Sequence, residues 1–440
     1  MSLLDADRRL ARDCWYEQSA SRGHPRPALR GRVDCDVAVV GGGIAGLSAA
    51  LELRRHGLSV RLLEAGRFGS GASGRNGGQA LHGLGCDLSV IEHQLGLDDA
   101  RRVFAMTLEA LDLMRARIQR HRIDCDWTDG CLTVATSARK AQALLKTADD
   151  LESRHDHAQR RIERAELRHW LDSPRYHAAL HDPVCGHLHP LKYTLGLAQA
   201  AEDAGALLHE DSAVTRVQQG SAVTLQTAAG QVRARHALLA GNVHIGTLAP
   251  AVGSRVMPVG TYIAATERLG PVLARSLIPS AAAVCDTDVV LDYFRLSADD
   301  RLLFGGRVSY STLTPARLAQ LMRRRIVQAF PQLAGVRVEH TWGGFVDITM
   351  NRAPDFGRIA PDAGGLGARG AVYYLQGFSG HGVALAGLAG RLVAEAISGD
   401  ATRFDVFSRL RHRPFPGGRW LRTPALVLGM AWYRLRDLLG

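Results

Sequence analysis

The stretch Cys35–Gly66, CDVAVVGGGIAGLSAALELRRHGLSVRLLEAG, determines the fold that we expect. Its apolar run Val37–Val40 is typical of a strand buried on both faces, and glycines follow at once. Ile44–Arg55 has helical character, and Ser59–Leu63 has the composition of a second strand, ending in Glu64. A strand, a glycine turn, a helix and a strand in this order predict an α/β fold with a parallel, Rossmann-like sheet.

The glycines Gly41, Gly43 and Gly46 match the pattern GxGxxG between the first strand and the helix. In this position the first glycine permits the tight turn, the second lets the backbone approach a pyrophosphate, and the third lets helix and strand pack closely. Glu64, 23 positions after Gly41, stands where an acid accepts hydrogen bonds from a ribose and disfavours a 2′-phosphate. The stretch therefore predicts a dinucleotide site that excludes NADP; the alternative is a glycine-rich turn without a ligand.

A second glycine-rich stretch, GSGASGRNGGQ at Gly69–Gln79, follows directly after Glu64. Such a loop would be unusual in a protein built around NAD alone. Its glycines let the backbone come close to a flat polar ligand, and Arg75 can face a phosphate or a flavin ring. The loop therefore favours FAD over NAD as the dinucleotide.

The composition is that of an ordinary globular protein, with 440 residues, 46% hydrophobic and 22% charged. A chain of this length suggests two or more lobes. The net charge is +11, but the arginines are scattered and no basic run or aromatic-interleaved basic stripe occurs. We therefore expect no nucleic-acid partner; weak attraction to an anionic membrane or ligand is the alternative.

The cysteines and the two ends of the chain bear on its location. Seven cysteines without a CxxC pair, and an opening MSLLDADRRL without an apolar segment, predict reduced thiols in the cytoplasm. PALVLGMAWY, Pro424–Tyr433, is too short to cross a membrane. It is either a buried terminal helix or a peripheral membrane contact.

Longer segments of the sequence resemble a known family. VAVVGGGIAGLSAALEL, LEAGRFGSGASGRNGGQ, GHLHPLKYTLGLA, LLAGNVHIG, LDYFRL, QGFSGHGVALAGLAGRLVAEAISG and PFPGGRWLRTP resemble the D-amino-acid-oxidase/glycine-oxidase-like flavoproteins. Within them the chain is most similar to the bacterial γ-glutamylputrescine oxidase group, which L-pipecolate oxidases also resemble. The resemblance runs from about residue 14 to the C-terminus and implies a two-domain α/β (α+β) flavoprotein: a Rossmann-like FAD-binding domain and a substrate domain with a mixed or antiparallel sheet and helices.

The resemblance also implies domain bounds and a set of FAD-binding positions. We expect an N-terminal arm at 1–32, a discontinuous FAD-binding domain at 33–95, 185–245 and 360–405, a substrate domain at 96–184 and 246–359, and a C-terminal tail or helix at 406–440. The FAD-binding positions are Gly41, Gly43, Gly46, Glu64, Ser73, Arg75, Asn76, Gly77, Gln79, Val214, Ala240, Gly241, Gly377, Ser379, Gly380, His381 and Gly382. The helix after Gly382 would direct its positive end toward the flavin C2 carbonyl. Some members of the superfamily tether flavin through a late cysteine; no cysteine follows Cys285, so we expect non-covalent FAD.

The activity that the resemblance implies is oxidation of an amine. Hydride leaves the carbon next to nitrogen for flavin N5, the imine is hydrolysed, and O2 is reduced to H2O2. The candidates for the flavin face are His82, Asp292, Tyr293 and His381. Asp292 can attract an ammonium, or instead pair with Arg295 or cap a turn.

The substrate is less well determined than the chemistry. We expect γ-glutamylputrescine or a related polyamine derivative; a cyclic or secondary amino acid such as L-pipecolate is the alternative, and its carboxylate would need Arg307 or Arg352. A third alternative is a membrane-associated dehydrogenase that passes electrons to quinone. Asp347 replaces an apolar residue of the γ-glutamylputrescine oxidase group, which bears on the substrate; it can also cap a loop.

Two further stretches carry groups that we assign to structure. HDPVCGHLHP brings His181, Cys185, His187 and His189 together in sequence, but their spacing fits no standard zinc pattern, so we expect no metal. The charged run DDLESRHDHAQRRIERAELRHW is expected to be a solvated helix face.

Overall fold

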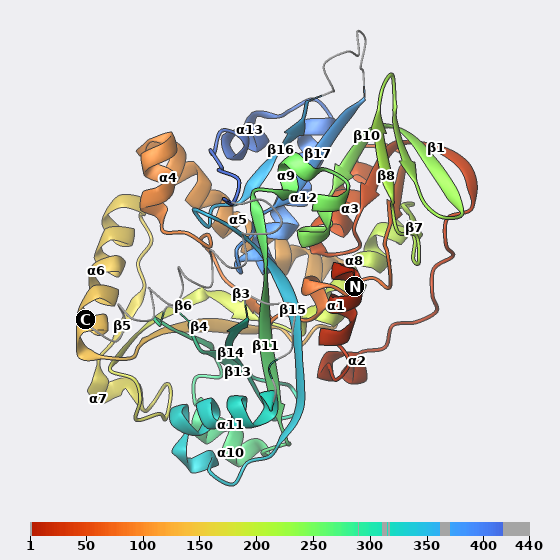
Figure 1. The fold of residues 1–440 in the computed structure, drawn as a ribbon. Helices are drawn as coiled ribbons and strands as arrows, with labels where there is room; N and C mark the ends of the chain where they lie inside the picture. Colours follow the sequence, from red (N-terminus) through yellow and green to blue (C-terminus); the bar gives the residue numbers. More distant parts are fainter. Residues whose placement is uncertain (1, 289, 310–314, 316, 361–369, 417–440) are drawn as a thin grey trace.

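The computed structural model describes residues 2–288, 290–309, 315, 317–360 and 370–416, and its strands form two sheets (Figure 1). The first sheet has the order β16-β17-β10-β1-β2-β7, with a β8–β9 hairpin on β10. Its strands are β1 (Gly31–Val40), β2 (Val60–Leu63), β7 (Leu207–His209), β8 (Arg216–Gln219), β9 (Val223–Gln226), β10 (Gly230–Leu239), β16 (Asp355–Ile359) and β17 (Ala371–Gln376). β1 lies between β2 and β10 and is parallel to both. The predicted parallel α/β unit is confirmed.

The two predicted elements next to the glycine turn occur close to their predicted bounds. α3 spans Ile44–Arg55, as predicted. β1 begins at Gly31, before the apolar run, because Gly31–Cys35 also pairs with β10. These extra residues are more exposed than Val37–Val39, which are fully buried.

The second sheet has the order β15-β11-β14-β13-β12-β4-β6-β3, with β5 on β6. Its strands are β3 (Gln79–Ala80), β4 (Thr128–Ala135), β5 (Arg160–Ile162), β6 (Ala178–His187), β11 (Val256–Thr266), β12 (Ala283–Asp286), β13 (Tyr293–Leu296), β14 (Leu302–Ser309) and β15 (Val338–Thr349). All pairs are antiparallel except β12 with β4. The mixed second sheet is the one expected for the substrate domain.

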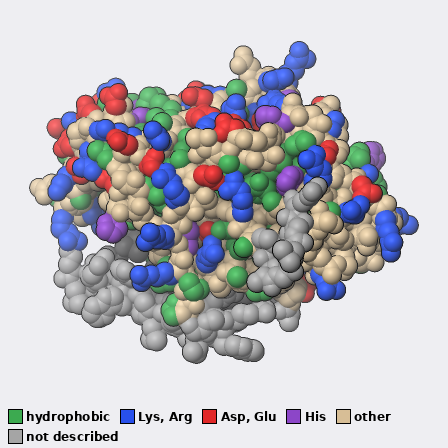
Figure 2. All heavy atoms as spheres, turned by 90° about the horizontal axis from the view of Figure 1, so that it is seen from above, with side chains coloured by type: hydrophobic (Ala, Val, Ile, Leu, Met, Phe, Trp, Pro, Cys, Tyr) green, Lys and Arg blue, Asp and Glu red, His purple; other side chains and the backbone are tan. Residues whose placement is uncertain are grey.

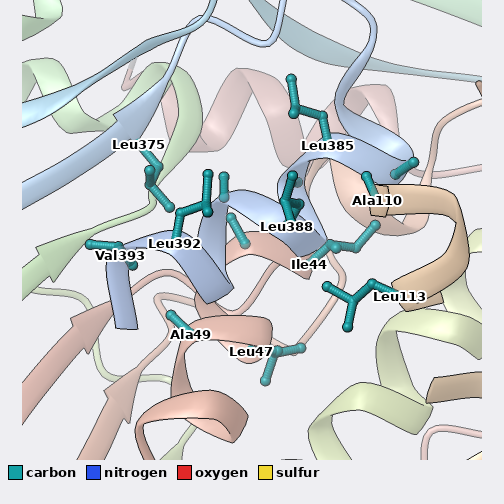
Figure 3. Packing of buried hydrophobic residues seen from close by; sticks show 14 of the residues in the cluster. Ile44, Leu47, Ala49, Ala110, Leu113, Leu375, Leu385, Leu388, Leu392 and Val393 are labelled. Carbon is teal, nitrogen blue, oxygen red and sulfur yellow. The ribbon is translucent and has the colours of Figure 1, made fainter. Parts of the chain in front are cut away.

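Helices pack between and around the sheets (Figure 1). Besides α3 they are α4 (Leu88–Leu95), α5 (Leu97–His121), α6 (Ala138–His155), α7 (Arg164–Leu167), α8 (Pro190–Asp203), α9 (Pro250–Gly253), α10 (Pro271–Leu277), α11 (Leu318–Ala329), α12 (Gly382–Ile397) and α13 (Thr402–Ser408). α12 packs against α3 so closely that a Cβ on Gly390 would lie 2.5 Å from the Ala45 carbonyl oxygen. Figure 3 shows this core, in which Leu47, Leu388 and Leu392 are fully buried.

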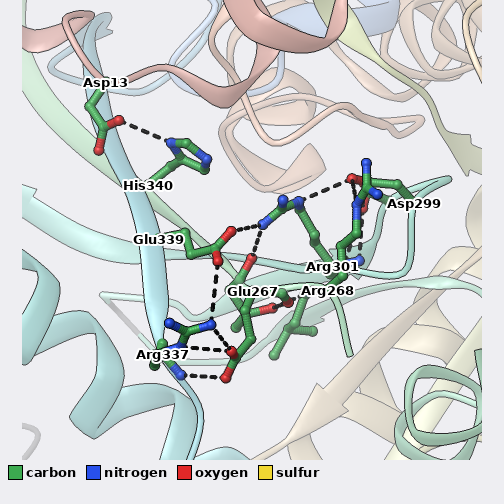
Figure 4. Close-up of polar contacts among 11 residues, drawn as sticks. Asp13, Glu267, Arg268, Asp299, Arg301, Arg337, Glu339 and His340 are labelled. Atoms are coloured by element: carbon green, nitrogen blue, oxygen red, sulfur yellow. Dashed lines mark hydrogen bonds and ion pairs between the residues drawn. The ribbon is translucent and has the colours of Figure 1, made fainter. Parts of the chain in front are cut away.

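The N-terminal 32 residues differ from the expected polar arm. They contain α1 (Leu3–Leu10), with a capping box between Ser2 and Asp5, and α2 (Trp15–Ser19). Leu10 and Tyr16 are buried in hydrophobic clusters with residues of the second sheet. The apolar residues of these two short helices pack on the second sheet, and residues 20–30 follow without helix or strand. Between the helices, Asp13 binds His340 of β15, next to the surface ion pairs of Arg301 and Arg337 (Figure 4).

Strand membership places three boundaries differently from the expected domain division. β16 belongs to the first sheet but precedes residue 360, β3 belongs to the second sheet although it lies within 33–95, and β6 continues past residue 184. These boundaries depend on which strands pair through their backbones, and the composition of a segment does not reveal that pairing. The segment 424–433 lies outside the described residues.

Among the described residues no single helix is long and apolar enough to cross a membrane. Only α12 and α13 taken together reach the required length and composition, and they meet at a bend of 117°. On the face shown in Figure 2, acidic and basic side chains are interspersed over the upper half of the view.

Candidate active site

The turn from β1 to α3 forms a cradle that only glycine fits. Gly41 has φ +111°, and a Cβ there would lie 2.5 Å from the Ala240 carbonyl oxygen. A Cβ on Gly46 would lie 2.0 Å from the Gly41 carbonyl oxygen. Backbone thus takes the space of side chains at both positions, and the start of α3 meets the end of β10 at Ala240 and Gly241.

Glu64 lies at the end of β2, next to this cradle. Its carboxylate accepts hydrogen bonds from the Gly42 N–H at 2.6 Å and the Gly66 N–H at 2.9 Å. Burial raises the pKa of Glu64, and these two N–H groups oppose the rise. The Glu64 carbonyl accepts from the Ser212 N–H at 2.7 Å, which brings the segment of Val214 to the same edge of the sheet.

The loop Gly69–Gln79 is held by hydrogen bonds to α3 and to the second sheet and is no linker. Ser73 Oγ accepts from the Ile44 N–H at 3.0 Å, at the first turn of α3. Asn76 Oδ1 accepts from the Gly78 N–H, and Gln79 Nε2 donates to the Val284 carbonyl in β12. Arg295 Nε donates to the Gly77 carbonyl at 2.7 Å. The side chains of Asn76 and Gln79 thus hold the shape of the loop, and its backbone faces the cradle.

Arg75 is buried and bound by protein groups. Its Nη1 lies 3.1 Å from Asp7 Oδ1 in α1, and its Nη2 donates to the Ser70 carbonyl. The Trp342 indole donates to the Arg75 carbonyl at 2.9 Å. Whether Arg75 contacts a cofactor stays a prediction, because its terminal nitrogens are engaged by Asp7 and the loop itself.

The loop Gly377–Gly382 follows β17 and leads into α12. Its Gly377 N–H donates to Asp347 Oδ2 at 2.5 Å, so Asp347 caps the loop, as the sequence suggested. Burial raises the pKa of Asp347 to about 7. Gly377 and Gly380 have φ angles of +77° and +93°. Ser379 has a φ angle of +50° and so also adopts a left-handed conformation.

His381 directly precedes α12. The segment after the glycine-rich loop lies against Ser379, two residues before His381. Burial, with the nearby Arg352 and His82 side chains, lowers the pKa of His381 to about 4, so its imidazole is neutral at pH 7. A Cβ on Gly85 would lie 2.7 Å from the Ser379 Cβ. His82 and His381 thus lie on two loops that pack together.

Tyr293 and Asp292 are neighbours in sequence but face different elements. A Cβ on Gly77 would lie 2.7 Å from Tyr293 Cε2, so the tyrosine ring lies against the glycine-rich loop. Asp292 is fully buried and pairs with Arg175 at 2.9 Å and with Arg325 of α11 at 2.6 Å. Of the alternatives, pairing with Arg295 is not observed, because Arg295 Nε donates to the Gly77 carbonyl. A role for Asp292 toward an ammonium stays a prediction.

The groups of HDPVCGHLHP are held apart by separate contacts. His187 Nε2 bonds the Ala281 carbonyl at 2.9 Å, whereas His189 accepts from the Lys192 N–H at the start of α8. The His181 ring lies against Trp170, tilted by 45° with the ring centroids 4.7 Å apart. The side chain of Arg307 lies outside the described ones, and Arg352 is exposed in the turn between β15 and β16.

Two residues near these loops, Asp182 and His157, escaped the sequence analysis. Asp182, in the same HDPVCGHLHP stretch, binds His82 and His157. His157 was assigned to a solvated helix face, but it follows the end of α6 and is buried. The alternating His and Asp residues in the HDH and HD stretches were the only local sign of such a cluster. The pairing of Asp182 with His82, 100 positions earlier, leaves no pattern in the sequence.

The geometry of the β1–α3 turn fits a dinucleotide. The cradle of Gly41, Gly43 and Gly46 leaves backbone N–H groups at the start of α3 for a pyrophosphate, and Glu64 stands at the end of β2 for a ribose. The chain matches the FAD dependent oxidoreductase family (DAO) over residues 36–396 and belongs to it. It is therefore an FAD-dependent oxidoreductase, with the two-domain α/β fold of that family.

Individual relatives agree with this assignment. The chain is 43% identical to the γ-glutamylputrescine oxidoreductase of Escherichia coli K12, covering 97% of this chain and 98% of that protein. It is 38% identical to the probable oxidoreductase OrdL of Haemophilus influenzae, covering 96% of each. The crystal structure of glycine oxidase from Geobacillus kaustophilus superposes with a TM-score of 0.72 at 23% identity, over 87% of this chain and 100% of that one.

Proposed function

We propose that the protein oxidises γ-glutamylputrescine or a closely related polyamine derivative. The observation that carries this proposal is the 43% identity to the E. coli γ-glutamylputrescine oxidoreductase over nearly the full length of both chains. When bound, FAD supplies the acceptor for the hydride that leaves the carbon next to nitrogen, and O2 then takes the electrons as H2O2. Hydrolysis of the imine releases an aldehyde and ammonia.

We further propose that the chain's own residues hold FAD without a covalent bond. The glycines of the β1–α3 turn and Ser73 line the pyrophosphate, Glu64 the ribose, and Val214 the adenine. Gly77, Gly377, Ser379, Gly380 and Gly382 come close to the ring system with their backbones, and the first turn of α12 directs N–H groups to it. Precipitation with trichloroacetic acid should leave the flavin in the supernatant.

The groups proposed for the substrate side are His82, Tyr293 and His381. His381 is neutral at pH 7, since burial and the nearby Arg352 lower its pKa to about 4, and it can exchange hydrogen bonds without carrying charge. The Tyr293 ring, against Gly77, limits the space beside the flavin loop. These groups position an amine; the oxidation needs no nucleophile.

A substrate panel on the purified holoenzyme tests the proposal. Under anaerobic conditions γ-glutamylputrescine should bleach the flavin absorbance near 450 nm faster than putrescine, L-pipecolate or glycine. Fast bleaching by L-pipecolate alone would instead identify a cyclic amino acid as the substrate. Absence of bleaching by every amine would refute amine oxidation.

The electron acceptor is tested on the same preparation. On admission of air and without membranes, the reduced enzyme should release one H2O2 per amine, which a peroxidase-coupled dye reports. If the reduced enzyme reacts slowly with O2 and fast with a soluble quinone, the protein is a dehydrogenase and not an oxidase.

A further inference from the structure

A buried carboxylate, Asp182 in β6, gathers two histidines from distant parts of the chain. Its Oδ2 lies 2.8 Å from His82 Nε2 and 2.6 Å from His157 Nε2. Gln159 Nε2 donates to the same oxygen at 2.9 Å, and the Val184 N–H donates to Oδ1 at 3.0 Å. Asp182 is only 1% exposed, so these four groups replace its hydration.

The charge of Asp182 determines which way these hydrogen bonds run. Burial would raise the pKa of Asp182, but the hydrogen bonds from His157 and His82 outweigh it and hold that pKa well below its ordinary value. Asp182 is therefore an acceptor-only carboxylate at neutral pH. Each imidazole must present Nε2–H to it.

This requirement fixes the tautomer of His82. A neutral imidazole that carries its proton on Nε2 has a lone pair on Nδ1. His82 Nδ1 is buried and has no hydrogen-bond partner among the described residues. In this tautomer His82 Nδ1 has a free lone pair that no donor of the described residues occupies.

His82 lies on the segment that packs against the loop before α12. It follows the glycine-rich loop, and Gly85, three residues on, packs against Ser379 of the loop that precedes α12. The titratable groups around it are Asp182 of β6, His157 beyond α6 and His381 before α12, and His381 is in turn near Arg352. The Phe104 ring of α5 separates His82 from His155.

The same three groups could also ligate a metal ion, and their ligand atoms lie within 4.8 Å of one another. However, ligands at 2.0–2.1 Å from a tetrahedral zinc stand roughly 3.3 Å apart. The observed separations of 2.8 and 2.6 Å are those of hydrogen bonds. The geometry favours shared protons over a shared ion.

We propose that Asp182 is a positioning residue that holds His82 as the base for the substrate ammonium, with His157 and Gln159 keeping the carboxylate in place. This inference rests on the proposed amine oxidation. His82 Nδ1 takes the proton: one N–H bond of the ammonium breaks, the Nδ1–H bond forms, and the positive charge moves to the imidazolium beside Asp182. The amine keeps its electron pair and is then ready to lose hydride.

The test compares wild type with Asp182→Asn in anaerobic stopped-flow reduction of the holoenzyme between pH 6 and 10. The amide can donate to His82 Nε2 and so favours the Nδ1–H tautomer, which has no lone pair on Nδ1. At pH 7 we expect reduction about 100-fold slower at saturating γ-glutamylputrescine. Near pH 10, where the amine is already neutral, the two rates should converge to within several-fold.

His82→Gln tests the same step without altering Asp182, since its amide can donate to the carboxylate but cannot act as a base. It should reproduce the pH profile of Asp182→Asn, and it keeps the inference testable if Asp182→Asn does not fold. Glu52→Gln is the matched control: Glu52 is also a buried carboxylate, paired with Arg117 at 2.7 Å in the α3–α5 core. Its pH profile should be that of wild type.

A second readout does not depend on turnover. Long-range 1H–15N NMR of histidine-labelled protein should show His82 as the Nε2–H tautomer in wild type and a change in Asp182→Asn. An equal loss of rate at every pH, an Nδ1–H tautomer in wild type, or one equivalent of bound metal lost in Asp182→Asn would overturn the inference. Wild-type flavin that no amine bleaches would refute the proposed function, and the NMR result would still decide the tautomer.

Discussion

Asp7 and Arg75 form a buried ion pair 3.1 Å long that joins the first helix of the chain to the glycine-rich loop. Both residues are nearly inaccessible, at 6% and 5% exposure. Asp7 Oδ2 also lies 3.7 Å from His244 Nε2, just beyond the end of β10. The N-terminal helix is thus attached to two of the segments that line the dinucleotide cradle.

Asp7→Asn should therefore destabilise the protein, because it leaves the buried Arg75 charge with only carbonyl acceptors. We expect a loss of about 3 kcal/mol in the free energy of unfolding, measured by urea denaturation. Asp13→Asn is the control, since Asp13 is half exposed and pairs with His340 at the surface. Its effect should stay below about 1 kcal/mol. Equal losses of unfolding free energy in the two variants would show that the buried Asp7–Arg75 pair stabilises the protein no more than the surface pair does.

Gly43→Ala should weaken FAD binding with little effect on the fold. The new Cβ would lie 2.6 Å from Ser73 Oγ, in the cradle at the start of α3. We expect at least about a tenfold weaker affinity for FAD, or roughly 1.4 kcal/mol, measured by flavin fluorescence on adding FAD to apoprotein. At Gly71 the space around a Cβ is open, so Gly71→Ala should bind as wild type does. Unchanged affinity in Gly43→Ala would place the pyrophosphate elsewhere.

The carboxyl of Asp347 should make stability depend on pH. Burial raises its pKa in the folded protein to about 7 from an ordinary value of 3.8. Its contribution is therefore fully present below about pH 4 and is lost as the pH rises through 7. Relative to Asp347→Asn, wild type should lose on the order of 3 kcal/mol between pH 4 and pH 7.5. Urea denaturation at several pH values measures this difference; parallel pH profiles of the two proteins would contradict it.

Asp292→Asn should affect stability more than turnover. The carboxylate is fully buried between Arg175 and Arg325, and its removal leaves two cations less compensated. We expect a loss of about 3 kcal/mol in the free energy of unfolding, with kcat and KM within twofold of wild type. A large rise in KM at unchanged stability would instead support ammonium recognition by Asp292. Glu267→Gln, which breaks the exposed Arg337 pair, is the control for a surface ion pair.

Much of the nucleotide-binding half could be predicted because its signals are local. The apolar run before Gly41, the glycine spacing and Glu64 at a strand end lie within one short stretch, and α3 occupies the predicted residues. The resemblance extended this to Ala240, whose carbonyl indeed lies beside Gly41. Asp347 could be recognised as a loop cap from its place in the motif.

The substrate half could not be predicted in the same detail, because its contacts join residues far apart in the chain. Asp182 meets His82 and His157 only because β6 packs between β3 and β4, with the end of α6 above them. Likewise, Arg295 binds Gly77 rather than the nearby Asp292, since alternate residues of a strand face opposite sides. The polar N-terminal residues conceal two short helices whose burial depends on the sheet beneath them.

The sequence by itself determined the dinucleotide cradle, because only glycine fits the backbone conformation of this turn and the glycines are therefore visible in the sequence. It also determined the family, because the loops around a flavin constrain many backbone positions at once. Only the tertiary structure decided which ionisable groups share a site: Asp7 with Arg75, Asp292 with Arg175 and Arg325, and Asp182 with two histidines. The physical reason is that a buried charge needs a partner in space, and the chain can supply that partner from any distance along the sequence.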